Sequence, residues 1–290
     1  MEANATKTPP LTPLPGTAPE GTWKVITADR DAADGRLATF AIVTRSTPTS
    51  AHLLGTGFYL QLKGGFATAA HVALEAQALL SASPDSVRIS HTLPDGRSVY
   101  RPIWKFFIHP HADVAFGIPR YDIIDDKTGE AFRLKVLSLN LSPPDIGAPI
   151  STWSYPLHRV LGDETKGQLL QLQPDFYNGT LQELFTERGP SAKLSPPYYL
   201  TNIHLYGGSS GGPVFNINGE AFGVASCSYD GAEDIAFVTP ASALLEIPVP
   251  ATITERADDG PMRPLGDVAG DTIVIARWNP FVRPPPEASG

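Results

Sequence analysis

The stretch Tyr-Gly-Gly-Ser-Ser-Gly-Gly-Pro-Val at residues 206–214 sets two adjacent serines among four glycines, immediately before a β-like run. Glycine reaches backbone conformations that other residues avoid, so such a stretch can present a hydroxyl and aim amide N–H groups at one point. Converging amides stabilise the oxyanion that forms during acyl transfer. A serine hydroxyl is a weak nucleophile by itself, so this chemistry also needs a base and a group that orients the base.

Two residues elsewhere in the chain fit the roles of base and orienting group. Among seven histidines, His71 ends the segment FATAAH, where a β-like run meets small residues and a short helical start, a place that puts a side chain at the rim of a barrel. Asp113 begins the apolar run DVAF, which partly buries its carboxylate and lets it accept a hydrogen bond from an imidazole. Asp113 lies 42 residues after His71 and 97 residues before Ser210.

Short β-like runs with turn signals between them recur on both sides of these motifs. The first group covers residues 23–27, 37–45, 57–62, 86–93, 98–108 and 114–118, and the second covers 134–139, 149–154, 169–172, 198–205, 214–217, 221–226 and 235–238. Such strands favour closed barrels or sandwiches, since closure removes exposed edges. With 26 glycines and 29 prolines in 290 residues, helices are few, and the two candidates follow Ala70 and cover 241–245. We predict an all-β fold.

Two hairpin turns are expected between these strands. Residues 94–97, Pro-Asp-Gly-Arg, separate two β-like runs of the first group, and Asn218-Gly219 carries the sequence signature of a type I′ turn in the second.

Composition limits the class of partner and the place of action. The net charge of −8 gives no general attraction to nucleic acid or to an anionic membrane, so neither is an expected partner. The single cysteine, Cys227, cannot form an internal disulfide, and the first thirty residues lack the pattern of a secretory signal. No apolar stretch is long enough for a membrane helix. The sequence therefore predicts a cytoplasmic protein.

The chain divides into four predicted regions. Residues 1–21 are rich in Pro, Thr and Ala and are expected to form a flexible arm, residues 22–125 a first β-barrel, residues 126–248 a second β-barrel, and residues 249–290 a C-terminal extension. The extension has loop-like composition except for the run 272–278, which is expected to add one strand.

Several motifs together resemble those of trypsin-like serine peptidases of the chymotrypsin fold: GTGF at 55–58, FATAAHV at 66–72, DVAF at 113–116, GGSSGGPVF at 207–215 and GVAS at 223–226. The resemblance covers residues 23–248 and is closest to disulfide-free bacterial branches, the high-temperature-requirement and glutamyl endopeptidase groups. It implies two six-stranded antiparallel β-barrels with the active site between them. It further implies His71 as general base, Asp113 as its orienting group, Ser210 as nucleophile, and the N–H groups of Gly208 and Ser210 as oxyanion hole. A protein or peptide substrate and no cofactor or metal are expected.

The family pattern Gly-x-Ser-Gly-Gly-Pro places Ser210 at the nucleophile and Ser209 at x. In the digestive enzymes of the family, x is an aspartate that pairs with a new N-terminus after zymogen cleavage. A serine carries no charge for such a pair, so we expect activity without N-terminal trimming.

The resemblance also maps a substrate pocket. Its walls correspond to Ser226, Cys227 and Ser228, and its floor lies near His204. No carboxylate is present there, which disfavours Lys or Arg before the scissile bond. The glutamyl enzymes place a histidine where this chain has Ala225, although His204 could still read an acidic side chain. We favour small or medium apolar side chains.

Two other interpretations remain open. The segment His109-Pro110-His111-Ala112-Asp113 has the H-x-H-x-D spacing of some zinc hydrolases, but only His158 and His204 are left downstream as further ligands. The chain could also be a catalytically silent peptide-binding or scaffold module on a peptidase fold. A cytosolic protease needs restraint, so a regulatory protein partner, docking on residues 1–21 or 261–290 in a bacterial regulatory or defence system, is a further expectation.

Overall fold

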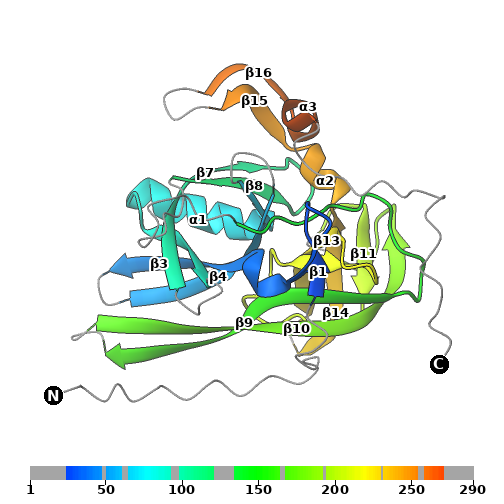
Figure 1. Ribbon diagram of the computed structural model, residues 1–290, viewed down its shortest axis with the longest axis horizontal. Coiled ribbons are helices and arrows are strands. Elements are labelled where there is room, and N and C mark those ends of the chain that lie inside the picture. Colours follow the sequence, from blue (N-terminus) through cyan, green and yellow to red (C-terminus); the bar gives the residue numbers. More distant parts are fainter. Residues whose placement is uncertain are drawn as a thin grey trace.

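The computed structural model describes residues 24–47, 50–60, 65–92, 98–120, 134–163, 167–191, 194–229, 231–253 and 258–270. Most of the regular structure is β and forms two closed six-stranded antiparallel barrels that lie side by side (Figure 1). The all-β, two-barrel fold predicted from the sequence is confirmed. The boundaries proposed at residues 22–125 and 126–248 remain predictions. None of the described helices is long and apolar enough to cross a membrane.

The first barrel has the strand order β3-β4-β5-β8-β7-β6. Its core is aromatic: the ring of Phe66 meets those of Phe40 and Phe106 edge-on, with centroids 5.2 and 5.7 Å apart. Gly117 leaves room for the Phe66 ring, since a Cβ there would lie 2.1 Å from it. The strands are β3 (Thr39–Thr47), β4 (Ser50–Tyr59), β5 (Phe66–Thr68), β6 (Val87–Thr92), β7 (Ser98–Ile108) and β8 (Ala115–Pro119).

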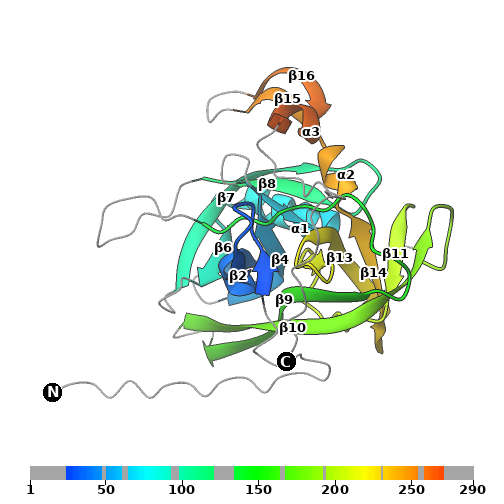
Figure 2. The ribbon, with the colours of Figure 1, turned by 45° about the vertical axis from the view of Figure 1, so that its right-hand side comes forward.

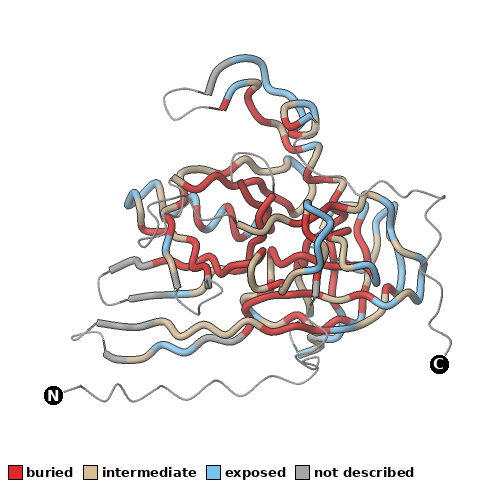
Figure 3. Tube along the Cα trace, in the orientation of Figure 1, coloured by how far each residue is buried: buried red, intermediate tan, exposed pale blue. Residues whose placement is uncertain are grey.

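The second barrel has the strand order β10-β11-β14-β13-β12-β9. Its strands are β9 (Pro149–Asp163), β10 (Gly167–Phe185), β11 (Tyr198–Thr201), β12 (Pro213–Phe215), β13 (Ala221–Tyr229) and β14 (Ala232–Pro240). The buried residues gather inside the two barrels and where they meet (Figure 3).

The strands β9 and β10 are far longer than predicted. They pair from Thr180 with Pro149 out to Gly167 with Asp163, and their far ends run beneath the β3–β4 hairpin (Figure 1). A small apolar cluster joins the two hairpins, with Tyr155 buried and Leu53, Leu170 and Leu172 packed around it. The sequence missed this extension because polar residues interrupt the apolar pattern on strands that are buried only where the hairpins touch.

Two predicted barrel strands are not barrel strands. The segment at 23–27 contains β1 (Lys24–Ile26), which pairs with β2 (Ala32–Asp34) in a separate two-stranded sheet. The three-residue strand β5 takes the sixth place in the first barrel instead. Residues 134–139 form only isolated bridges, because this segment links the barrels: the N–H of Leu137 donates to Tyr59 O, and that of Asn140 to Ala221 O.

The two predicted helices are present near their predicted places, whereas the predicted turns are not confirmed. Helix α1 (Ala70–Ala82) follows β5, α2 (Ser242–Leu245) follows β14, and a short 3₁₀ turn covers Gly35–Leu37. Residues 94–97 lie outside the described residues. The prediction of a type I′ turn at Asn218-Gly219 is wrong. Such a turn needs a positive φ at both central residues, and of these two only Gly219 has one, +77°. The turn is wider, since Asn216 Oδ1 accepts the N–H groups of Asn218 and Glu220.

The region after Pro248 is more ordered than its composition predicts. It contains β15 (Pro248–Ile253), β16 (Asp258–Pro264) and α3 (Leu265–Ala269), which project beyond the first barrel (Figure 2). The prolines of this region favoured a loop prediction. Both strands of a two-stranded sheet are edge strands, however, and proline is tolerated on an edge strand. Val249 and Leu265 are buried, so the hairpin is anchored to the body. The predicted run 272–278 and the arm at 1–21 lie outside the described residues.

Candidate active site

His71 and Asp113 meet at one end of the first barrel. His71 is the second residue of α1, and Asp113 lies in the loop between β7 and β8. His71 Nδ1 lies 3.0 Å from both carboxylate oxygens of Asp113. An ionised carboxylate only accepts hydrogen bonds, so this contact places the imidazole proton on Nδ1 and leaves Nε2 free to accept one.

The same carboxylate also fixes the backbone of His71. The residue before α1, Ala69, provides no side-chain cap, and the N–H of His71 donates to Asp113 Oδ1 at 3.0 Å. The first amides of a helix lack acceptors within the helix, and Asp113 supplies the acceptor for one of these amides. The side chain of Asp113 is 12% exposed and that of His71 is 50% exposed. Asp113 is thus shielded while the imidazole remains open to a ligand.

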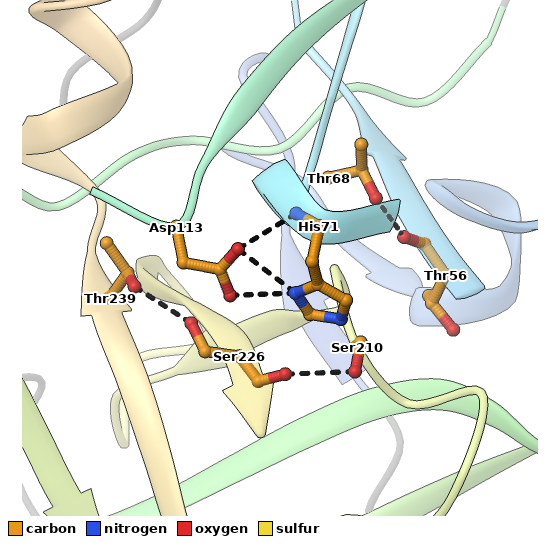
Figure 4. A network of polar contacts seen from close by, with 7 residues as sticks. All are labelled: Thr56, Thr68, His71, Asp113, Ser210, Ser226 and Thr239. Atoms are coloured by element: carbon orange, nitrogen blue, oxygen red, sulfur yellow. Dashed lines mark hydrogen bonds and ion pairs between the residues drawn. The ribbon is translucent and has the colours of Figure 1, made fainter. Parts of the chain in front are cut away.

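Ser210 approaches this pair from the second barrel. It lies in the glycine turn between β11 and β12, across the imidazole from Asp113 (Figure 4). Its Oγ donates to the carbonyl of Ser226 on β13 at 2.9 Å. Within the described part of the chain, no hydrogen bond joins Ser210 to His71. The hydroxyl must therefore exchange Ser226 for the imidazole before it can give up its proton.

The turn around Ser210 is shaped by glycine. Gly208 and Gly211 have φ of +94° and +89°, which residues with a Cβ rarely adopt. A Cβ on Gly211 would also lie 2.2 Å from Thr56 O. Among the described residues, the amides of Gly208 and Ser210 donate to no protein acceptor, whereas those of Ser209, Gly211 and Gly212 do. The two amides of the predicted oxyanion hole are therefore available to a ligand oxygen.

Thr56 ties this turn to the first barrel, a role that sequence reasoning missed. Its Oγ1 donates to Gly208 O at 2.7 Å and accepts the N–H of Tyr155 on β9 at 3.0 Å. Its backbone N–H donates to Ser210 O at 2.8 Å. Its carbonyl accepts from Thr68 Oγ1 at 2.7 Å (Figure 4). The motif GTGF pointed to this strand, but the partners of Thr56 are far away in the sequence.

Ser209 anchors the turn within the second barrel. It is fully buried, and its Oγ accepts a hydrogen bond from Ser154 Oγ on β9 at 3.0 Å. The anchor is a neutral pair of hydroxyls.

The four predicted pocket residues lie along β13 and the segment before the turn. Ser226 is buried and its Oγ bonds Thr239 Oγ1 at 2.8 Å, while Cys227 and Ser228 are partly exposed. Ser228 Oγ donates to Leu205 O at 2.8 Å, so β13 is tied directly to the segment that carries His204. The ring of His204 stacks on Tyr206 at a centroid distance of 6.0 Å.

The side chains of the H-x-H-x-D segment do not converge on a common point. His109 Nδ1 accepts the N–H groups of His111 and Ala112, and Asp113 is engaged by His71. Among the described residues, no group of three histidine, cysteine, aspartate or glutamate side chains is arranged to hold a metal ion. The side chain of His158 lies outside the described residues. This geometry argues against the zinc interpretation.

Two barrels that present a serine and an aspartate-bound histidine at their junction define a serine peptidase class of site. Residues 55–224, more than half of the chain, match the trypsin-like peptidase domain. The chain belongs to the family of trypsin-like peptidases. No curated protein sequence matches it.

Solved structures with a similar fold include three proteases. The active form of Rv3671c protease from M. tuberculosis is 17% identical, with a TM-score of 0.49 over 82% of this chain and 90% of that one. Deg5 is 18% identical, with a TM-score of 0.49 over 71% of this chain and 85% of that one. The HtrA-type protease AlgW, solved with a tripeptide, is 17% identical, with a TM-score of 0.47 over 71% of this chain and 57% of that one.

Substitution of Thr56 by valine tests the role of its hydroxyl, because valine has nearly the same shape and no hydroxyl. Thr56→Val leaves Gly208 O and the N–H of Tyr155 without their partner, so we expect the free energy of unfolding to fall by about 1–3 kcal/mol. We also expect Ser210 to react with a fluorophosphonate about tenfold more slowly, the effect of losing one hydrogen bond that positions it. Thr56→Ser keeps the hydroxyl and is the matched control, with near-normal labelling. Equal labelling of Thr56→Val and wild type would contradict this role.

Proposed function

We propose that this chain is a serine endopeptidase that cleaves peptide bonds in protein substrates through an acyl-enzyme on Ser210. The observation that carries the proposal is the histidine held by a shielded carboxylate opposite a serine in a glycine turn. This arrangement gives a nucleophile, a base and an orienting group in one place, as acyl transfer requires.

The first half of the reaction forms the ester. Ser210 Oγ bonds to the substrate carbonyl carbon as its proton passes to Nε2 of His71, and the carbonyl electron pair moves onto oxygen. The amides of Gly208 and Ser210 bind that oxyanion, which they can do because neither donates to an acceptor among the described residues. The C–N bond then breaks, and the leaving amine takes the proton from Nε2.

The second half releases the product. A water molecule gives its proton to Nε2 and attacks the ester carbonyl, and the collapse of this second tetrahedral intermediate returns the proton to Ser210. Asp113 stays ionised throughout and stabilises the imidazolium that forms twice. The residues named here account for every proton transfer, and we propose no cofactor.

A catalytically silent peptide-binding module is the second candidate. One observation favours it: Ser210 Oγ is bonded to Ser226 O rather than to His71. In proteins of this kind, catalytic hydrogen bonds often tighten only when substrate binds, so the contact does not exclude catalysis. Labelling by a fluorophosphonate separates the candidates, since only an activated serine reacts.

We further propose that the enzyme is bacterial and cytoplasmic and is held in check by a regulatory protein partner. These three proposals rest on the sequence arguments above. Co-purification of the chain from its host, followed by a measurement of peptidase activity with and without the captured partner, tests the last of them.

Ser210→Ala removes the nucleophile without changing the turn. We expect turnover to fall by roughly 10⁶-fold, as when the nucleophile of another serine protease is removed. Fluorophosphonate labelling should vanish, and the thermal unfolding curve should be unchanged. Ser209→Ala is the informative neighbour, since it should still be labelled. Undiminished cleavage by Ser210→Ala would end the proposal.

Removal of residues 1–22 should leave peptidase activity unchanged. The turn is anchored by Ser154 and Ser209 in the second barrel, so no free amino group is needed to order it. The measurement compares kcat/KM of the full chain with that of the shortened chain. A large rise on shortening would show that trimming activates the enzyme.

We expect cleavage after small or medium apolar residues. The pocket residues provide no carboxylate for Lys or Arg, and the hydrogen bond between Ser228 and Leu205 ties one wall of the pocket to the segment that forms its floor. A peptide-library cleavage profile measures this preference. A dominant preference for glutamate would instead assign the pocket to His204, and one for Lys or Arg would refute the argument from charge.

A further inference from the structure

The loop that carries Asp113 is built around the imidazole of His109. The N–H of His109 donates to Val114 O at 3.0 Å and closes the base of the loop. Inside it, His109 Nδ1 accepts the N–H of His111 at 3.1 Å and that of Ala112 at 2.7 Å. The side chain is only 10% exposed. The ring therefore takes the place of a backbone acceptor for the residues just before Asp113.

These contacts define the state of the ring. A nitrogen that accepts two N–H groups carries no proton, so the imidazole is neutral and its proton is on Nε2. Nε2 faces Glu246, which follows α2, with its Oε2 3.7 Å away. Burial lowers the pKa of His109 below its usual value of 6.5, the carboxylate of Glu246 raises it, and His111 lowers it. Among the described residues, Glu246 and His111 are the titratable groups that face the ring.

We propose that His109 is a positioning residue for Asp113, holding the loop in shape while neutral and releasing it when protonated. The inference rests on the proposed function of Asp113 as the partner of His71. Asp113 must bind both the imidazole and the backbone N–H of His71 with one carboxylate. That double contact fixes where the backbone at 112–113 must lie, and the N–H of Ala112 is bonded to His109.

The direction of the pH effect follows from the lowered pKa. The folded protein binds fewer protons at His109 than the unfolded chain does, so the contribution of the ring is complete above pH 6.5. It is lost as the pH falls through the pKa of the folded state. A protonated ring donates from both nitrogens and can no longer accept from the two amides. Acid therefore loosens the loop that carries Asp113.

Three variants of the full chain isolate this role. His109→Asn puts an acceptor, Oδ1, at the position of Nδ1 but does not titrate. His109→Leu has similar bulk and no acceptor. His111→Asn removes the neighbouring histidine, whose backbone N–H rather than its side chain bonds His109. At pH 7.5 we expect Ser210 labelling by a fluorophosphonate to be about tenfold slower in His109→Leu and near normal in His109→Asn and His111→Asn.

The pH profile adds a readout that a purely structural role would not move. As the pH falls through the folded-state pKa of His109, which lies below 6.5, the labelling rate of His109→Asn relative to wild type should rise, because only wild type loses the loop by protonation. A constant ratio, or a His109→Asn variant as slow as His109→Leu, overturns the proposal.

Proton NMR of His71 tests the same inference without catalysis. The Nδ1 proton that is bonded to Asp113 exchanges slowly with water while the contact holds. It should be visible in wild type and in His109→Asn, and lost in His109→Leu. If wild type shows this proton and the variants follow the pattern but Ser210 is never labelled, the peptidase proposal fails and the role of His109 stands. If His109→Leu keeps the proton, the role of His109 is refuted.

Discussion

The proposed nucleophile and base belong to different barrels, so everything at the site depends on how the barrels are held together. The hydroxyl of Thr56 makes this connection directly, since it bonds Gly208 in the turn and Tyr155 in β9 from a strand of the first barrel. Around it, a continuous apolar cluster includes Phe58 and Phe116 from one barrel and Trp153 from the other. Close-packed interiors resist small displacements, so this cluster keeps the hydroxyl of Thr56 and its two partners at fixed positions.

Neutral hydroxyls perform the tasks at this site that charges could perform. Ser154 holds Ser209, Thr239 holds Ser226, and Thr68 holds Thr56. Such bonds avoid the desolvation cost of a buried ion pair and do not change with pH in the physiological range. The pH sensitivity that we propose falls on His109, in the loop that carries Asp113.

The sequence revealed what local patterns can reveal. Glycines around Ser210, small residues before His71 and an apolar run after Asp113 each mark a local geometry, and their order matched a known family. The sequence could not reveal the roles of Thr56 and His109. The hydroxyl of Thr56 bonds a carbonyl 152 residues away, and His109 looked like half of a zinc motif until its Nδ1 was found bonded to its own loop.

The errors in the predicted fold have the same origin as the missed roles of Thr56 and His109, because they too depend on contacts that a local sequence pattern does not show. By sequence pattern, residues 23–27, which contain β1, count among the strands of the first barrel, whereas the β-like run at 66–68, which is β5, serves only to place His71. Closure of the barrel decides between them, since β5 bonds both β4 and β8. Whether a short run becomes a strand depends on the two neighbours that need its edges, and these lie elsewhere in the chain.

The C-terminal segment shows how the end of the chain can bear on the site. The chain leaves the second barrel at β14. Ile247, which lies between α2 and β15, and Val249 of β15 then join the same apolar cluster as Phe116 of the first barrel. Glu246, which directly follows α2, faces the imidazole of His109 in the loop that carries Asp113. A segment that starts in one barrel and buries apolar residues against the other restrains their relative motion. Residues that follow the strands of both barrels in the sequence therefore contact the loop that carries Asp113.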